Sequence, residues 1–186
     1  MRGGQVAKAI SASPEIPGAW RALQAGDLSP DGSVRWAALR WVIPTGSGER
    51  SVIQEGDVLV PLRSARVSSL VARGVPSGTI AVGHWAIITP SAQVLSDYLA
   101  WYLAHPVTER LLGSQVVGSN LPFVPLSAIR ELEIEVPALA VQERIVRVQA
   151  LHRRQQELEQ QITQVRERYV NAITQAALER AAQPKH

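Results

Sequence analysis

The spacing of apolar residues along this chain changes from a strand-like to a helical pattern at about residue 90. Before that point, short apolar runs alternate with Gly, Pro and Asp, which is typical of a small β-rich domain with tight turns. Strands are predicted at residues 58–62, 67–71, 79–82 and 85–89, with a looser alternation at 34–42. The pair Asp31-Gly32 between apolar flanks predicts a hairpin turn.

Two short helices are predicted after this region. The first is defined by apolar residues at helical spacing: Leu95, Tyr98, Leu99, Tyr102 and Leu103. We expect Ser91 to cap this helix and Pro106 to end it. Pro106 also fits the first turn of a second helix, which Gly113 would end.

The region from residue 132 onwards combines a predicted strand with a long predicted helix. Leu132, Ile134 and Val136 alternate with Glu133 and Glu135, which predicts a strand with one apolar and one acidic face. A charged helix follows, and the a and d positions of its heptads form an apolar seam: Val148, Leu151, Gln155, Leu158, Ile162, Val165, Tyr169, Ala172 and Ala176.

The seam predicts that the long helix pairs with another helix. Residues 141–180 would form a rod about 60 Å long, which is longer than a domain of this size can cover. We therefore expect a homodimer through the seam, with the two helices either parallel or antiparallel. Gln155 at an a position either fixes the register of the pair or is a solvated interruption.

These patterns together predict an α+β fold. A small, mainly β domain with short helices would occupy residues 18–138, and a long coiled-coil helix would occupy residues 139–182. Residues 1–17 are rich in Gly, Ala, Ser and Pro without a period, so we expect a flexible lead-in there. A chain of 186 residues has room for one domain of ordinary size and such an appendage.

Signals for disulfides and for membranes are both missing from the sequence. The chain has no cysteine, which excludes a disulfide framework and fits a cytoplasmic protein. The first 20 residues lack the continuous apolar core of a signal peptide, so none is predicted. The longest uncharged stretch is interrupted by Pro76, His84 and Pro90, so no membrane span is predicted.

Positive charge is carried almost entirely by arginine. The net charge is only +3, but all except two of the 19 basic residues are Arg. Six of these arginines lie within residues 35–73, against three acids. The planar guanidinium suits phosphate oxygens and guanine edges, although the base composition of a genome also explains arginine richness.

The sequence contains no recognisable catalytic pattern. Its four histidines have no metal-like spacing: His84, His105, His152 and His186. The segment Gly46-Ser47-Gly48 is too short for a phosphate-binding loop and lacks the lysine of such loops. The cofactor-binding and catalytic motifs of an adenine methyltransferase are also missing. We therefore expect no metal, no cofactor and no enzymatic activity.

A short motif marks the junction between the predicted strand and the long helix: Pro137, Leu139, Ala140, Gln142, Ile145 and Val146. It resembles the junction in the specificity subunits of type I restriction-modification systems, where the helix opens on a motif close to Pro-Pro-Leu-Ala-Glu-Gln-x-x-Ile-Val. Ala138 and Val141 depart from that motif. A glutamate at position 141 would favour a helix N-terminus, so its absence weakens this start without arguing against a helix.

The resemblance extends into the preceding domain. The matching features, in chain order, are Gly26-Asp27-Leu28, Gly56-Asp57-Val58-Leu59, an aromatic helix at residues 98–103 and the turn Gly118-Ser119-Asn120. A single Gly-Asp pair usually marks only a turn. Four such features in order, followed by the junction motif, are much more specific.

The resemblance implies a non-catalytic subunit that recognises double-stranded DNA. Complete family members carry two recognition domains spaced by two antiparallel helices, which adenine methyltransferase subunits bind, with a restriction subunit as a further possible partner. One domain and one helix imply a half-subunit that dimerises, or a fragment.

Arginine suits phosphate and guanine, while Gln and Asn suit adenine. On this basis the expected DNA-contacting residues are Arg35, Arg40, Arg63, Ser64, Arg66, Arg73, Ser114, Gln115, Ser119 and Asn120. The sequence leaves two other functions open. One is an adaptor that binds proteins through the β domain and oligomerises through the helix, and the other is an enzyme whose site a partner completes.

Overall fold

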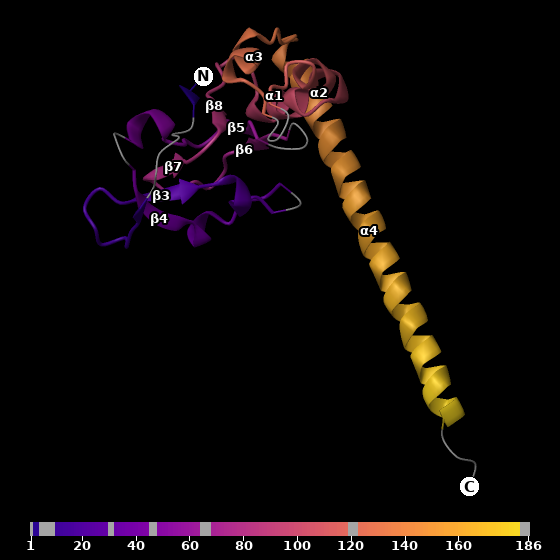
Figure 1. Ribbon diagram of the computed structural model, residues 1–186. Coiled ribbons are helices and arrows are strands. Elements are labelled where there is room, and N and C mark those ends of the chain that lie inside the picture. The colour runs from indigo at the N-terminus through magenta and orange to yellow at the C-terminus, as the bar shows by residue number, and fades with distance from the viewer. Residues whose placement is uncertain are drawn as a thin grey trace. The chain divides into compact units, whose positions relative to one another are not determined.

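The computed structural model describes residues 2–3, 10–29, 32–44, 48–63, 68–118 and 123–182 (Figure 1). The chain divides into two compact units, Met1–Glu143 and Arg144–His186. The first unit holds small sheets and short helices, and the second holds most of one long helix. The predicted α+β fold class is therefore confirmed.

Within the described residues, one sheet has the strand order β1-β8-β5-β6, with every pair antiparallel. Its strands are β1 (Arg2–Gly3), β5 (Val58–Pro61), β6 (Leu70–Val71) and β8 (Trp85–Ile88). All residues of β5 are buried, as expected for a continuous apolar run in a central strand. β5 and β8 confirm two predicted strands, and β6 is the described end of the strand predicted at 67–71.

A second sheet in the described part of the chain has the order β2-β4-β3-β7. Its strands are β2 (Ile10–Ser11), β3 (Trp20–Leu23), β4 (Arg40–Ile43) and β7 (Thr79–Ala81). β3 pairs with β7 in parallel, and the other pairs are antiparallel. β1 and β2 fall within the expected lead-in of residues 1–17, whose composition gave no sign of strands.

Each of the two Gly-Asp turns contains the same kind of local hydrogen bond. The Asp27 carboxylate accepts the Gln24 N–H at 2.8 Å, and the Asp57 carboxylate accepts the Gln54 N–H at 2.9 Å. Gly56 has a φ of 81°, which glycine adopts without the steric cost of a side chain. The first turn is the 3-10 element η1 (Ala25–Asp27), and the second leads directly into β5. The two Gly-Asp pairs therefore determine where the chain turns.

The helices of the described residues are α1 (Ser96–Leu103), α2 (Pro106–Gly113), α3 (Leu126–Glu131) and α4 (Leu139–Ala182). α1, α2 and α4 confirm predicted helices, whereas the sequence did not predict α3. The His105 ring accepts a backbone N–H of the first turn of α2, and Pro106 is the first helical residue. The expected Ser91 cap is wrong, because α1 begins after Leu95, whose N–H donates to the Gln142 side chain.

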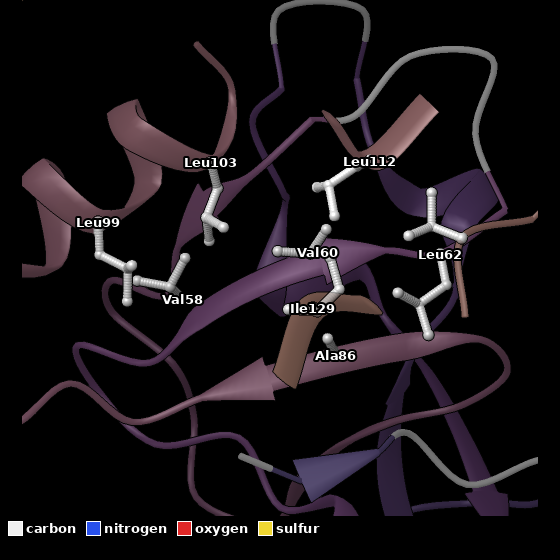
Figure 2. Close-up of a cluster of buried hydrophobic side chains, with 9 residues drawn as sticks. Val58, Val60, Leu62, Ala86, Leu99, Leu103, Leu112 and Ile129 are labelled. Atoms are coloured by element: carbon white, nitrogen blue, oxygen red, sulfur yellow. The ribbon is translucent and has the colours of Figure 1, made fainter. Parts of the chain in front are cut away.

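The main hydrophobic core lies between β5, β8 and the three short helices (Figure 2). Its buried residues are Val58, Val60, Leu62, Ala86, Leu99, Leu103, Leu112, Val124 and Ile129. Leu59 points to the opposite face of β5 and joins a second core that contains Leu23 and Ala81 of the other sheet. β5 therefore packs against helices on one face and against the second sheet on the other.

The strand predicted at residues 132–136 is wrong. The predicted alternation is nevertheless visible in the packing, since Leu132 and Ile134 pack against the core and the glutamates between and after them are exposed. The segment lies over the core without a partner strand among the described residues. The Tyr98 hydroxyl donates to the Glu135 carbonyl at 2.7 Å, and burial raises the pKa of Tyr98.

Gln142 anchors the first turn of α4 within the unit Met1–Glu143. This side chain is fully buried. Its Oε1 accepts the Leu95 N–H at 2.9 Å, and its Nε2 donates to the carbonyls of Gln93 at 2.9 Å and Pro137 at 2.8 Å. The junction motif noted in the sequence therefore contains a residue that ties the helix start to the loop before α1.

α4 exposes its predicted apolar seam. The large apolar side chains of the seam are 42% (Leu158) to 67% (Tyr169) exposed. The 44 residues of the helix extend over about 66 Å. An apolar row of this length, interrupted among its a and d positions by Gln155, is typical on a charged helix of a surface that pairs with another helix.

Candidate nucleic-acid interface

Arg63 lines a surface cavity of about 330 Å³. The lining residues come from separate segments of the unit Met1–Glu143: Gln24, Ala25, Arg63, Val82, Gly83, His84 and Trp85. Arg63 is exposed, whereas Trp85 is buried in the core. None of the lining residues is acidic, so the cavity offers a cation and hydrogen-bonding groups without a competing carboxylate.

Strand pairing brings these segments together. The Leu62 N–H donates to the His84 carbonyl at 2.8 Å, which extends the pairing of β5 and β8 up to the residue before Arg63. The Val82 N–H donates to the Leu23 carbonyl at 2.8 Å, which places the turn between β7 and β8 beside the end of β3. The cavity therefore forms where β3, β5 and β7 end.

A fourth segment borders His84. Val117 and Phe123 exchange two backbone hydrogen bonds, at 3.0 and 3.1 Å, and so close a loop. The Phe123 ring centroid lies 6.5 Å from the centroid of the His84 ring, and the Val124 N–H donates to the Leu62 carbonyl at 2.9 Å. The base of this loop therefore lies beside the cavity.

Four predicted DNA-contacting residues lie outside the described residues: Ser64, Arg66, Ser119 and Asn120. In sequence, the first two follow Arg63 closely. In sequence, the other two fall between Val117 and Phe123. Of the described residues that flank these two segments, Arg63 lines the cavity, and Phe123 lies beside His84 of its lining.

The fixed charge of the cavity is that of Arg63. Burial lowers the pKa of His84 from its usual 6.5, and the Arg63 guanidinium lowers it further. At neutral pH the imidazole is therefore uncharged and offers one donor and one acceptor. A negatively charged group in the cavity would oppose both effects and favour the protonated ring.

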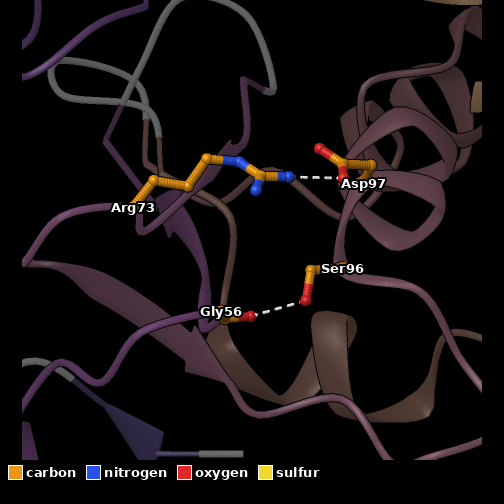
Figure 3. Close-up of polar contacts among 4 residues, drawn as sticks. All are labelled: Gly56, Arg73, Ser96 and Asp97. Atoms are coloured by element: carbon orange, nitrogen blue, oxygen red, sulfur yellow. Dashed lines mark hydrogen bonds and ion pairs between the residues drawn. The ribbon is translucent and has the colours of Figure 1, made fainter.

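Arg73 is engaged within the domain. Its guanidinium forms an ion pair with Asp97 at 2.5 Å (Figure 3), and this hydrogen bond raises the pKa of Arg73. Nearby, the Ser96 hydroxyl donates to the Gly56 carbonyl at 2.7 Å (Figure 3). These contacts join the start of α1 to the strands, so DNA would have to compete with Asp97 for this arginine.

The other predicted residues lie on elements that do not line the cavity. Arg35 precedes the 3-10 turn η2 (Trp36–Ala38), Arg40 begins β4, and both side chains are exposed. Ser114 follows α2 and its hydroxyl donates to the Leu111 carbonyl at 2.7 Å, while Gln115 is exposed. Of the predicted set, the structure thus places only Arg63 among the described lining residues.

Gln24 and His84 line the cavity but are not predicted from the sequence. His84 has no neighbour in sequence that marks it as a partner of Arg63, because strand pairing creates that proximity. Gln24 has a weak signal, since the pattern Gln-x-Gly-Asp recurs at residues 24–27 and 54–57. That pattern indicates a turn and gives no indication of a cavity.

The described part of the chain shows no group of three or more His, Asp or Glu side chains placed to hold a metal ion. It also contains no helix of sufficient length and apolarity to cross a membrane.

No protein-family model matches this chain, and no curated protein matches it. Among solved structures, the chain is similar to one from work on the complex assembly and conformational transition of the type I R-M system. The two chains are 21% identical with a TM-score of 0.44, and the match covers 97% of this chain and 42% of that one. This chain therefore spans less than half the length of that chain, and the likeness assigns it neither a family nor a function.

Proposed function

We propose that this chain is a non-catalytic DNA sequence-recognition subunit of a type I restriction-modification system. The unit Met1–Glu143 would read one DNA half-site, and α4 would pair with a second copy and bind the adenine methyltransferase subunits, with a restriction subunit as a further partner. One observation carries the proposal. The domain that holds the acid-free Arg63 cavity continues into a 44-residue helix with an exposed apolar seam.

The two parts of this observation support different parts of the function. Exposed arginines, Arg63 above all, suit the phosphate backbone of DNA, which supplies most of the affinity of a protein for duplexes. The helix is a spacer with a pairing surface, which an enzyme acting alone does not need. The sequence resemblance supports the domain and the helix acting together, because in the family that the chain resembles a recognition domain precedes such a helix.

A homodimer through α4 has a consequence for the DNA target. If the helices pair antiparallel, a two-fold axis crosses the pair, and the domains are attached at opposite ends. Identical domains related by this axis read identical half-sites on opposite strands, so the target is an interrupted palindrome. A parallel pair would keep the dimer but would not produce this arrangement of half-sites.

The purified chain is expected to bind random duplex DNA weakly and in a salt-dependent manner. The dissociation constant should fall in the range of about 10⁻⁴–10⁻⁶ M that is usual for non-specific binding, because one small surface neutralises few phosphates. A methyltransferase partner should lower this dissociation constant. Fluorescence anisotropy of a labelled duplex at several salt concentrations, with retention on heparin as a second assay, measures the effect. Indifference to both polyanions would instead favour the protein-interaction adaptor.

The chain alone is expected neither to methylate nor to cleave DNA. The reason is that its sequence lacks nucleotide-binding, methyl-transfer and nuclease motifs. The measurement is incubation of the purified chain with duplex DNA, S-adenosylmethionine, ATP and magnesium, followed by detection of methylated and cut products. Turnover by material free of methyltransferase and nuclease would contradict the non-catalytic assignment.

A further inference from the structure

We propose that the cavity at Arg63 binds a phosphodiester group of the DNA backbone. In this assignment Arg63 supplies the charge, and the side chains of His84 and Gln24 supply hydrogen bonds. The inference rests on the proposed function and deepens it, because it separates a phosphate-positioning contact from contacts that read bases.

The charge of the lining favours an anion. The arginines that pair with described acids are Arg73, with Asp97, and Arg154, with Glu157, and neither lines the cavity. Arg63 is exposed and has no ion pair with any residue that the structure describes. A guanidinium with this freedom can direct two parallel N–H groups at two oxygens of one phosphate.

The uncharged polar residues of the lining complete a hydrogen-bonding site. A neutral His84 ring can donate from one nitrogen, and the Gln24 amide group carries two further N–H donors. Asp27 is the acid nearest to Gln24 in sequence, and its carboxylate accepts the Gln24 backbone N–H at 2.8 Å. The Asp27 carboxylate is therefore engaged at the turn and is not among the groups that line the cavity.

The shape of the site decides between a phosphate and a base. Reading a base edge requires an element that protrudes into a groove of the duplex, such as a helix or a ribbon. A recess is less suited to this than a protruding element, whereas phosphates project outward from the duplex and can enter a recess. Arg63 within a cavity therefore fits the phosphate backbone better than a guanine edge.

The test measures the salt dependence of DNA binding in Arg63 variants of the full chain. Loss of one phosphate contact lowers the magnitude of the slope of log K against log salt by about 0.9. We expect this change in Arg63→Ala, with affinity at low salt reduced on the order of tenfold. Arg63→Lys keeps the charge and should keep the slope. The matched control is Arg110→Ala, which removes an exposed arginine of α2 outside the cavity and should leave the slope unchanged.

A second measurement follows His84 directly. The chain has four histidines, so the ring signals in a nitrogen-15 NMR spectrum are few, and His84→Gln assigns the one of interest. Addition of inorganic phosphate or of a short duplex should shift the His84 signal in the wild-type chain and much less in Arg63→Ala.

The outcomes separate this inference from the proposed function. Wild-type binding to DNA with an unchanged slope in Arg63→Ala would refute the cavity assignment and leave the DNA-recognition function intact. An equal change of slope in Arg110→Ala would also refute it. If the wild-type chain binds no DNA, the recognition function fails. A phosphate-induced shift of His84 would then identify an anion site whose ligand is not DNA.

Discussion

Replacing Leu158 and Ile162 by aspartate is expected to convert a homodimer into a monomer. The two residues lie one turn apart on the seam of α4, and in the single chain they are 42% and 50% exposed. Pairing would bury both, and each buried carboxylate would cost several kcal/mol. Light scattering at tens of micromolar protein should give the mass of two chains for the wild type and of one chain for the double variant.

A matched control separates loss of the seam from loss of the helix. Gln160 and Gln164 are also spaced by four residues but lie outside the a and d positions, so Gln160→Asp with Gln164→Asp adds the same charges to a solvated face. This control should remain a dimer. The fold of Met1–Glu143 should be intact in both variants, because its cores contain no residue of the seam. A monomeric wild type, or a dimeric seam variant, would refute the proposed pairing.

The regular elements could be predicted where the sequence pattern is local. β5 is a run of apolar residues after a Gly-Asp turn, and α2 begins at His105 and Pro106, so each carries its own start signal. The helix α4 could be predicted from the heptad spacing of its apolar residues. Each of these patterns depends on neighbours within a few residues, which a sequence displays directly.

The errors in prediction arise where tertiary packing decides the structure. Residues 132–136 alternate between apolar and acidic side chains as a strand does. The alternation arises because Leu132 and Ile134 pack against the core, and no strand lies beside this segment in the described structure. α1 has no side-chain cap of its own, because a hydrogen bond from Leu95 to Gln142, 47 residues away, replaces the expected Ser91. A hydrogen bond between residues so far apart in sequence leaves no local signal.

The candidate site shows the same division. Arg63 could be named from the sequence, since residue type and clustering of arginines point to nucleic acid. Its neighbours Gln24 and His84 could not, because the pairing of β5 with β8 and of β3 with β7 sets their proximity. A sequence therefore predicts which residue types favour DNA binding more readily than which of them share one site.

A large loss of stability is expected from a single substitution at Gln142. Gln142→Leu keeps the approximate size of the side chain and removes its hydrogen bonds to Leu95, Gln93 and Pro137. At about 0.5–1.5 kcal/mol for each of the three bonds, the free energy of unfolding should fall by about 1.5–4.5 kcal/mol. All five tryptophans lie in Met1–Glu143, so urea unfolding followed by tryptophan fluorescence reports on this unit.

The control for this substitution is Gln156→Leu, at an exposed position of α4 outside the a and d positions. It makes the same chemical change without removing a buried hydrogen bond, so its effect should stay within about 0.5 kcal/mol. Both variants are compared with the wild type at one protein concentration, because dimerisation adds to apparent stability. Equal stability of Gln142→Leu and wild type would mean that the buried amide does not anchor α4. A loss confined to Gln142→Leu would show that the start of the helix is held by the domain, as the proposed role of α4 as a spacer requires.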